Sequence, residues 1–410
     1  MPSPKILVLG NYRQTITIIR SLGKAGYRLV VGRNHENRRV FTQYSRYTAE
    51  IWPHPSIEEA PSDFVESLVR FLNERRDIDF VFPVGEGEIL CLMRHCDLQS
   101  LPSGLTVVMN EPELFETCLD KFRLYKIVAQ LGIPHAAHRK AMNYTELISM
   151  AEALGYPCVI KPNDSLKAFF DKKALIVESA ADLRRQIPTW PEGNEFLVLQ
   201  KFVRGCRHNC DFIADEGRIL AYFEQRVLRT DRRDGTGYGV DTVSCAPTAQ
   251  LRKYCDALIQ GLNYSGLGCA QFLVNGEDGS ANFLELNPRM DAMNALPFYC
   301  GHDFPRMAVE YAAHRSGRTP SPPPSAYPTG KRATWLWGDL NGWLRALKTK
   351  DLNLWQSLIW LGQSALLPFS GDMDQTWSWG DPLPGAYMFV DLASRTLRHF
   401  AHRLAAFVRR

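Results

Sequence analysis

The chain has 410 residues, of which 45% are hydrophobic and 22% are charged. This length is sufficient for two or three domains with sizeable cores. The formal net charge of +4 is too small to indicate nucleic acid as a main partner. Ten cysteines are scattered along the chain without a CxxC pair, which predicts reduced thiols in a cytoplasmic setting.

The N-terminal part alternates between strand and helix patterns. An apolar run at residues 5–10 predicts a buried strand, followed by a helical stretch to residue 25 and a second strand at 27–31. The alternation continues with a helix, a strand, a helix and a strand at residues 64–75, 79–83, 86–96 and 105–109. This order predicts a parallel α/β domain. The first turn, Gly10-Asn11-Tyr12-Arg13, departs from GxGxxG, which argues against a nicotinamide dehydrogenase.

From residue 120 onward the pattern is mixed. Asp120 is a suitable N-cap for a helix at 120–131, and a second helix at 144–154 leads into a strand at 158–162. Further strands are predicted at residues 174–178, 195–200, 210–214 and 218–226. Spacing alone indicates a mixed α/β region here.

The most informative pattern is a pair of strands around a Gly/Asp turn. An apolar strand at 270–275 meets the turn at 276–279, and a second strand follows at 281–286. Its end presents a carboxylate, an amide and a guanidinium at alternate positions: Glu285, Asn287 and Arg289. On a strand these point to one face, within reach of Gln271 on the partner strand, while Leu284 and Leu286 pack behind them. Hard oxygen ligands beside a fixed cation are typical of Mg-nucleotide chemistry.

These strands resemble the metal-binding end of an ATP-grasp ligase, in the branch similar to the ATP-binding unit of the carbamoyl-phosphate synthase large subunit. The resemblance covers residues 4–316 and implies that Gln271, Glu285 and Asn287 hold two Mg²⁺ ions, for which Mn²⁺ can substitute. It also implies an α/β fold class: an N-terminal parallel α/β domain, an ATP-grasp fold of two α+β subdomains, and a Trp-rich C-terminal extension. The boundaries expected on this basis are 1–118, 119–205, 206–318 and 319–410.

The resemblance also assigns a nucleotide site. Lys121 and Lys161 match the two family lysines that touch ATP phosphates, and the stretch Gln200, Lys201, Phe202 and Val203 resembles the hinge that meets adenine. Two departures stand out. The phosphate-covering loop at 163–170 has no glycine, so its grip on phosphate is expected to differ. The acidic residue usual near the ribose is absent, and Asp211 is the candidate to supply that contact.

At the reacting end we expect two arginines to act. Arg289 lies beside the metal carboxylate, and Arg226 is the candidate to grip a carboxylate or acyl phosphate. The alternative for Arg226, a surface arginine paired with Glu224 or Asp231, stays open. The glycine-rich stretch 234–239 is expected to form a substrate-gating loop.

The C-terminal extension allows two interpretations. Asp381-Pro382-Leu383-Pro384 resembles a motif in a loose group of ATP-grasp proteins similar to D-aspartate ligase. The uncharged run at 352–369 predicts a buried or interfacial helix. The last helix, 394–410, is amphipathic and arginine-rich. Docking on its own domain is favoured, and peripheral contact with an anionic membrane is the alternative.

The resemblance implies an ATP-dependent carboxylate–amine ligase that works through an acyl phosphate and releases ADP and phosphate. Its partners would be a small carboxylate and an amine, with no nucleic acid. Homodimers are common among such ligases, whereas the sequence itself leaves the oligomeric state open. Two alternatives stay open: a bicarbonate-activating enzyme of the carbamoyl-phosphate synthase kind, and a catalytically weakened ATP-binding regulatory protein.

Overall fold

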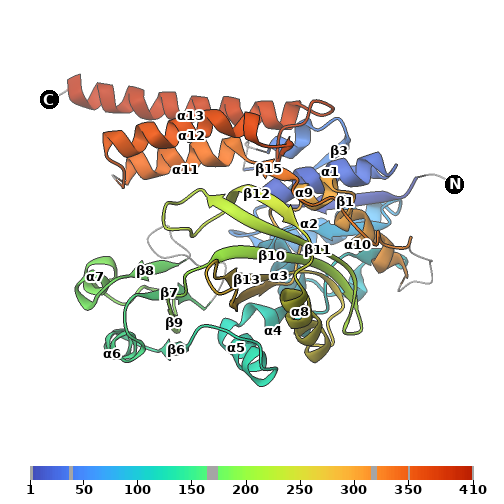
Figure 1. The fold of residues 1–410 in the computed structure, drawn as a ribbon. Helices are drawn as coiled ribbons and strands as arrows, with labels where there is room; N and C mark the ends of the chain where they lie inside the picture. The colour runs from blue at the N-terminus through green and yellow to red at the C-terminus, as the bar shows by residue number, and fades with distance from the viewer. Residues whose placement is uncertain (1–2, 37–39, 164–173, 315–320, 350, 409–410) are drawn as a thin grey trace. The chain divides into compact units, whose positions relative to one another are not determined.

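The computed structural model describes residues 3–36, 40–163, 174–314, 321–349 and 351–408 (Figure 1). The chain forms two compact units. The first comprises Met1–Val108, Ala292–Ser321 and Lys331–Arg410, and the second comprises Met109–Asp291 and Pro322–Gly330. The expected boundaries at 118 and 318 therefore shift, and residues 319–330 and the C-terminal extension do not form a separate domain.

The first unit is built on the parallel sheet that the alternation predicts. Its strand order is β3-β2-β1-β4-β5, and every neighbouring pair is parallel. The strands are β1 (Lys5–Leu9), β2 (Arg28–Asn34), β3 (Thr48–His54), β4 (Phe80–Pro83) and β5 (Thr106–Val107). The helices of this part are α1 (Arg13–Lys24), α2 (Pro61–Glu74) and α3 (Glu86–His95), with short 3-10 turns at η1 (Phe41–Tyr44) and η2 (Leu98–Ser100). All five residues of β1 are buried, as expected for the centre of a parallel sheet.

The C-terminal part of the chain completes this first unit. Helix α1 packs against α9 (Ala295–Tyr299) and α10 (Phe304–His314), and the Ser21 hydroxyl donates a hydrogen bond to Asp303. Beyond them follow β15 (Arg332–Thr334), α11 (Leu336–Lys348), α12 (Leu354–Ser370), β16 (Met373–Asp374) and α13 (Leu383–Val408). No helix among the described residues is both long and apolar enough to cross a membrane.

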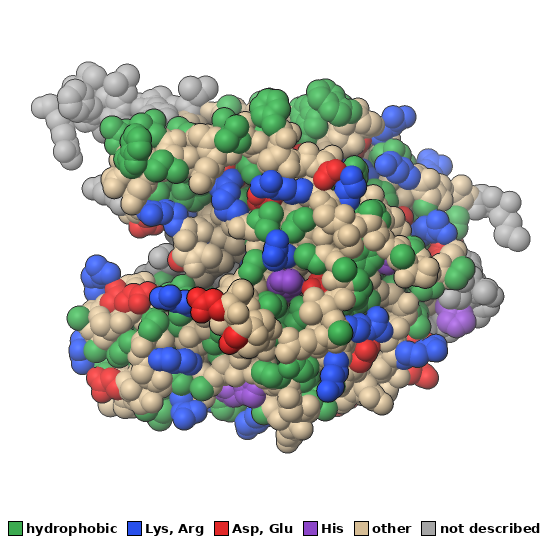
Figure 2. Space-filling view, in the orientation of Figure 1, with side chains coloured by type: hydrophobic (Ala, Val, Ile, Leu, Met, Phe, Trp, Pro, Cys, Tyr) green, Lys and Arg blue, Asp and Glu red, His purple; other side chains and the backbone are tan. Residues whose placement is uncertain are grey.

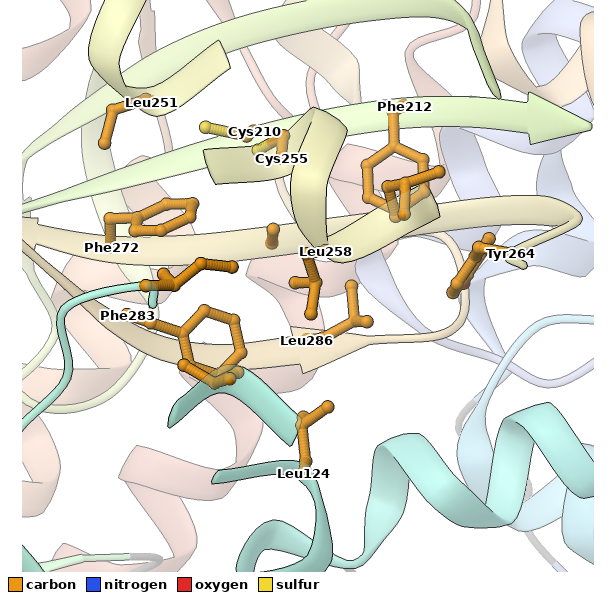
Figure 3. Close-up of a cluster of buried hydrophobic side chains, with 14 of the residues drawn as sticks. Leu124, Cys210, Phe212, Leu251, Cys255, Leu258, Tyr264, Phe272, Phe283 and Leu286 are labelled. Atoms are coloured by element: carbon orange, nitrogen blue, oxygen red, sulfur yellow. The ribbon is translucent and has the colours of Figure 1, made fainter. Parts of the chain in front are cut away.

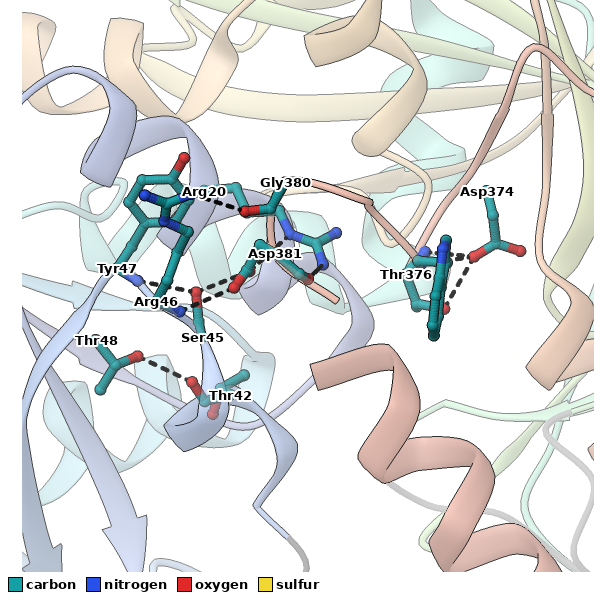
Figure 4. Close-up of polar contacts among 11 residues, drawn as sticks. Arg20, Thr42, Ser45, Arg46, Tyr47, Thr48, Asp374, Thr376, Gly380 and Asp381 are labelled. Atoms are coloured by element: carbon teal, nitrogen blue, oxygen red, sulfur yellow. Dashed lines mark hydrogen bonds and ion pairs between the residues drawn. The ribbon is translucent and has the colours of Figure 1, made fainter. Parts of the chain in front are cut away.

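Asp381, from the Asp-Pro-Leu-Pro motif, anchors the C-terminal part to the N-terminal strands (Figure 4). Its carboxylate accepts hydrogen bonds from Arg20 Nε at 3.0 Å, Ser45 Oγ at 2.9 Å and the backbone N of Arg46 at 2.8 Å. Arg20 also donates to the Asp381 carbonyl oxygen. A buried, fully hydrogen-bonded carboxylate of this kind is a structural element, so the structure gives the motif an anchoring role.

The second unit contains two antiparallel sheets. The smaller has the order β6-β9-β7-β8 and a core shared with α6 (Tyr144–Leu154) and α7 (Ala180–Gln186). Its strands are β6 (His138–Ala141), β7 (Cys158–Pro162), β8 (Leu175–Val177) and β9 (Leu197–Lys201). Helices α4 (Pro112–Leu119) and α5 (Lys121–Gln130) precede it, and the Asp120 side chain caps α5 as predicted.

The larger sheet carries the strand pair singled out in the sequence. Within the second unit its order is β14-β13-β10-β11-β12. The strands are β10 (Cys206–Asp215), β11 (Arg218–Thr230), β12 (Gly239–Cys245), β13 (Gly266–Val274) and β14 (Ala281–Asn287). Helix α8 (Ala249–Gly261) covers one face, where Leu258 packs with Phe212, Phe272 and Leu286 (Figure 3). Because strand side chains alternate, the opposite face is free to carry polar groups.

A β-bulge in β14 changes one expectation. The register shifts between the Gln271 and Phe272 pairs, which leaves Leu284 as the extra residue of β14. As a result Phe283 and Leu286 both belong to the α8-side core, whereas Leu284 is only half-buried. The prediction that Leu284 packs behind the polar residues is therefore wrong, because strict alternation does not survive a bulge.

Candidate active site

The three predicted metal ligands meet on the sheet face opposite α8. Gln271 lies directly opposite Glu285 in the β13–β14 ladder, and Asn287 lies opposite Cys269. Asn287 Nδ2 donates a 3.0 Å hydrogen bond to Glu285 Oε1. One carboxylate and two amide side chains thus share one patch, and oxygen donors of this type fit Mg²⁺.

Glu285 stands in a strongly positive environment. Burial alone would raise its pKa, but the charge of Lys161, the hydrogen bond from Asn287 and the charges of Lys121 and Arg207 outweigh burial and lower the pKa below its ordinary value. The carboxylate is consequently ionised at neutral pH, as a metal ligand must be.

Both predicted phosphate lysines lie close to this carboxylate. Burial lowers the pKa of Lys161 to about 8, against the opposing effect of Glu285. Lys121 Nζ donates to the carbonyl oxygens of Pro162 at 3.3 Å and Asn163 at 3.0 Å. Lys121 thereby binds the end of β7. Most of the glycine-free loop that follows, including Ser165, Lys167 and Lys172, lies outside the described residues.

Side chains of the hinge stretch, residues 200–203, form hydrogen bonds with neighbouring segments. Gln200 is 3% exposed and hydrogen-bonds with Tyr125, whose hydroxyl donates to the carbonyl oxygen of Leu284 in β14. Lys201 Nζ donates to the Tyr156 carbonyl oxygen at 3.2 Å. The contacts of Gln200 and Tyr125 link the small sheet to β14. A contact between the backbone at 201–203, with Phe202 and Val203 as walls, and adenine stays a prediction.

The structure does not bring Arg226 to this patch. Arg226 lies opposite His208 in the β10–β11 ladder. The neighbouring pair, Asn209 and Gln225, lies on the sheet face opposite α8, which also carries Gln271, Glu285 and Asn287 and is called the polar face below. Alternation therefore places Arg226 on the other face, where it is exposed. Arg289 is half-buried immediately after β14 and donates to the Met290 carbonyl oxygen at 3.0 Å.

Arg207 is the cation that the sequence reasoning missed. It occupies the same face of β10 as Asn209, and its charge contributes to the lowered pKa of Glu285. Its Nη1 donates to the Gly237 carbonyl oxygen at 2.9 Å. The Tyr238 backbone N also donates to Asp231 Oδ1 at 2.8 Å. The stretch 234–239, which was expected to form a gating loop, is therefore held by hydrogen bonds. Counting alternate positions back from Asp211 along β10 would have found Arg207.

Asp211 lies in a buried acidic group on the same face. The ligand atoms of Asp211, Cys269 and Asp291 all lie within 4.8 Å of one another. Gln225 Nε2 donates to Asp211 Oδ2 at 2.8 Å, and Asn209 Nδ2 donates to Asp291 Oδ2 at 3.2 Å. Burial and the charge of Asp291 raise the pKa of Asp211 well above its ordinary value. The contact between Asp211 and the ribose stays a prediction.

In and beside this acidic group, three buried oxygen atoms have no hydrogen-bond partner among the described residues: Asp211 Oδ1, Asn209 Oδ1 and Gln225 Oε1. Buried polar atoms are ordinarily paired, so unpaired ones call for an explanation. All three are acceptors, and their natural complement is a donor or a cation.

Part of the chain is similar in sequence to known proteins. Residues 120–309 match the family model of the carbamoyl-phosphate synthase L chain ATP-binding domain. The carbamoyl phosphate synthase large chain of Xylella fastidiosa is 28% identical over 210 residues, which span 48% of this chain and 19% of that relative.

Solved structures agree in fold. The biotin carboxylase domain of Hydrogenobacter thermophilus 2-oxoglutarate carboxylase, in complex with MgADP, ADP and bicarbonate, superposes with a TM-score of 0.61 at 16% identity, over 81% of this chain and 74% of that one. The L-amino acid ligase of Bacillus licheniformis superposes with a TM-score of 0.58 at 14% identity, over 76% and 74%. The residues matched by the family model contain both lysines, the hinge and strands β13 and β14, so this part of the chain is similar to the ATP-binding domain of the carbamoyl-phosphate synthase L chain.

Proposed function

We propose that the protein is an ATP-dependent carboxylate–amine ligase that forms an amide through an acyl phosphate. The observation that carries this proposal is the patch of Gln271, Glu285 and Asn287, close to cationic side chains from three separate segments: Lys121, Lys161 and Arg207. Arg289 follows Asn287 by two residues in the chain. A protein that only binds nucleotide has no need for a complete metal patch beside a reactive-end arginine, so the regulatory alternative is disfavoured.

The proposed role of each site residue follows from its charge. Gln271, Glu285 and Asn287 would hold Mg²⁺, which neutralises charge on the phosphate oxygens when bound. Lys121 and Lys161 are placed to neutralise phosphate oxygens from the side of the small sheet. Arg289 and Arg207 would supply planar forks that bind the anionic substrate carboxylate and the oxygens of the phosphoryl group that it accepts from ATP, with ADP as the leaving group.

The acidic group of Asp211, Cys269 and Asp291 suits the amine. An amine substrate enters as an ammonium ion, a triple donor, and the unpaired acceptors Asp211 Oδ1, Asn209 Oδ1 and Gln225 Oε1 match that need. Because the pKa of Asp211 is raised, this carboxyl is suited to accept the proton that the amine must lose before it attacks the acyl phosphate. Amide formation then releases phosphate.

Release of ADP and phosphate from Mg-ATP, measured with pooled carboxylates and pooled amines, tests the proposal. A ligase should need one acid pool and accelerate with one amine pool. With hydroxylamine in place of the amine, an acyl phosphate should be trapped as a hydroxamate. ADP release that needs bicarbonate alone would favour the carbamoyl-phosphate type of reaction. ATP binding without turnover in any pool would favour the regulatory protein.

A matched pair of arginine variants tests whether the activity depends on the polar face. Arg289→Ala should lower the rate of hydroxamate formation about a hundredfold, whereas Arg226→Ala, on the other face, should leave it unchanged. Equal losses in both variants would contradict the placement of the site. Whether the protein forms a homodimer is a separate question for sedimentation equilibrium.

A further inference from the structure

Helix α12 buries polar side chains and exposes apolar ones. Its 17 residues include no charged side chain. The buried positions are Ser357, Trp360, Ser364 and Leu367, so two of the four are serines. The exposed positions are mostly large and apolar. A helix on the surface of a water-soluble domain ordinarily shows the reverse pattern.

Hydrogen bonds fix which side of α12 faces inward. Asp339 of α11 is fully buried and accepts from Trp360 Nε1 at 2.9 Å and from Ser364 Oγ at 2.6 Å. Trp343 Nε1, also from α11, donates to Ser357 Oγ at 2.8 Å. Rotating the helix to hide its apolar side would break both of these hydrogen bonds to a buried carboxylate, which is unfavourable. The outward apolar face is therefore a fixed feature of the fold.

The outer face of α12 is extensive. Its large side chains and their exposed fractions are Phe369 at 87%, Leu354 at 78%, Trp355 at 70%, Leu366 at 66%, Leu358 at 53% and Ile359 at 46%. Within α12, every residue of which the structure describes, Gln363 is the single exposed polar side chain. Exposed Trp379, Leu383 and Val390 add to the apolar surface of this region. Hydrophobic side chains gather on the surface over the C-terminal helices (Figure 2). Apolar surface of this extent marks an interaction site.

The chemistry of this face favours a lipid surface over a protein. A protein partner ordinarily meets a polar rim with hydrogen-bonding groups, which the outer face of α12 lacks. Exposed tryptophan and phenylalanine beside aliphatic residues suit the headgroup–acyl boundary. The surrounding sequence has an excess of basic side chains, since residues 341–410 carry eight basic and five acidic side chains. Anionic headgroups complement that charge.

The length of α12 defines how it would meet the lipid. At 1.5 Å per residue, 17 residues span roughly 25 Å, less than the hydrocarbon thickness of roughly 30 Å. Its inner side is also held to α11 by Asp339. We propose that the outer face of α12, defined by Leu354, Trp355, Leu358, Ile359, Leu366 and Phe369, lies in the plane of an anionic membrane surface and docks the protein there. This differs from the docking first considered for the last helix, whose side chains from residue 397 onward lie outside the described part.

Co-sedimentation of the full-length chain with lipid vesicles tests this inference. The protein should bind vesicles of phosphatidylcholine containing phosphatidylglycerol, and bind less to pure phosphatidylcholine. The double variant Leu358→Glu/Leu366→Glu should weaken binding about tenfold or more. Leu228→Glu, which changes a 43% exposed leucine of β11, is the matched control and should bind like the wild type. Circular dichroism and thermal unfolding establish that both variants are folded.

Independent outcomes would overturn the proposal. Absence of binding to the anionic vesicles would refute it, and so would equal binding by the double variant. A concentration-dependent dimer in sedimentation equilibrium, lost in the double variant while no vesicle binds, would assign the face to a second copy of the chain. Because vesicle binding needs no turnover, its failure is distinguishable from failure of the proposed ligase activity.

Discussion

The two faces of the β10–β14 sheet each hold a glutamate, and the two glutamates have opposite surroundings. Glu224, on the α8 side, is fully buried and accepts hydrogen bonds from His208 at 2.9 Å, Thr248 N at 2.8 Å and Thr248 Oγ1 at 2.7 Å. Glu285, on the polar face, has cations nearby, and among the residues that the structure describes Asn287 is its side-chain hydrogen-bond donor. A carboxylate whose lone pairs are satisfied supports the fold, whereas one surrounded by charge and short of donors is prepared for a ligand.

The largest expected effect comes from Glu285→Gln. Removing the charge from the ligand patch should lower ligase turnover about a hundredfold or more. It should leave thermal stability unchanged or raise it, because a half-buried charge with few hydrogen-bond donors contributes little to folding. Parallel measurement of ADP release and melting temperature checks both. A large loss of stability would show that Glu285 is structural, like Glu224.

Glu224→Gln should show the reverse. The loss of charge-assisted hydrogen bonds should reduce the free energy of unfolding by about 1–3 kcal/mol while turnover stays near that of the wild type. Burial would raise the pKa of Glu224, but the hydrogen bonds from His208 and Thr248 outweigh it and lower the pKa.

This lowered pKa gives the Glu224 prediction a pH dependence. The stabilisation is fully present above the ordinary carboxyl pKa of about 4.3 and is lost as the pH falls through the lower folded value. The stability gap between wild type and Glu224→Gln should thus be widest near neutral pH and close in acid. Chemical denaturation across that range measures it, and a gap independent of pH would contradict the assignment.

Lys161 provides a pH test on the polar face. Its pKa of about 8 means that its charge is present at neutral pH and is lost as the pH rises through that value. ATP affinity should therefore fall by up to about tenfold per pH unit above about 8. Lys161→Arg, which keeps its charge, should remove this dependence. Equilibrium binding of ATP across this range measures it, and a common slope for both proteins would exclude Lys161 as the titrating group.

How much of this site the sequence could predict depends on the range of the interactions. Period-two alternation was sufficient to bring Glu285 and Asn287 to one face, with Gln271 opposite. Alternation alone could not locate the bulge at Leu284, nor tell which face of β11 carries Arg226, because both depend on the register with a partner strand. The anchor between Arg20 and Asp381 joins residues 361 positions apart, and no local pattern encodes it.

The smallest expected effect tests how Arg207 is held on the polar face. Gly237 has a φ of +90°, and a Cβ there would lie 2.3 Å from Asp231 Oδ1, the atom that accepts from the Tyr238 backbone. Gly237→Ala should disturb this turn and release Arg207 from the Gly237 carbonyl, and lower turnover several-fold, on the order of 1 kcal/mol. Gly235→Ala is the matched control, since Gly235 has a φ of +77° with nothing within 4 Å of its Cβ position. Both variants carry similar backbone strain, so a loss confined to Gly237→Ala isolates the collision with Asp231. Equal rates in the two variants would mean that the turn does not position Arg207, and the polar face would then rest on Glu285 and its lysines alone.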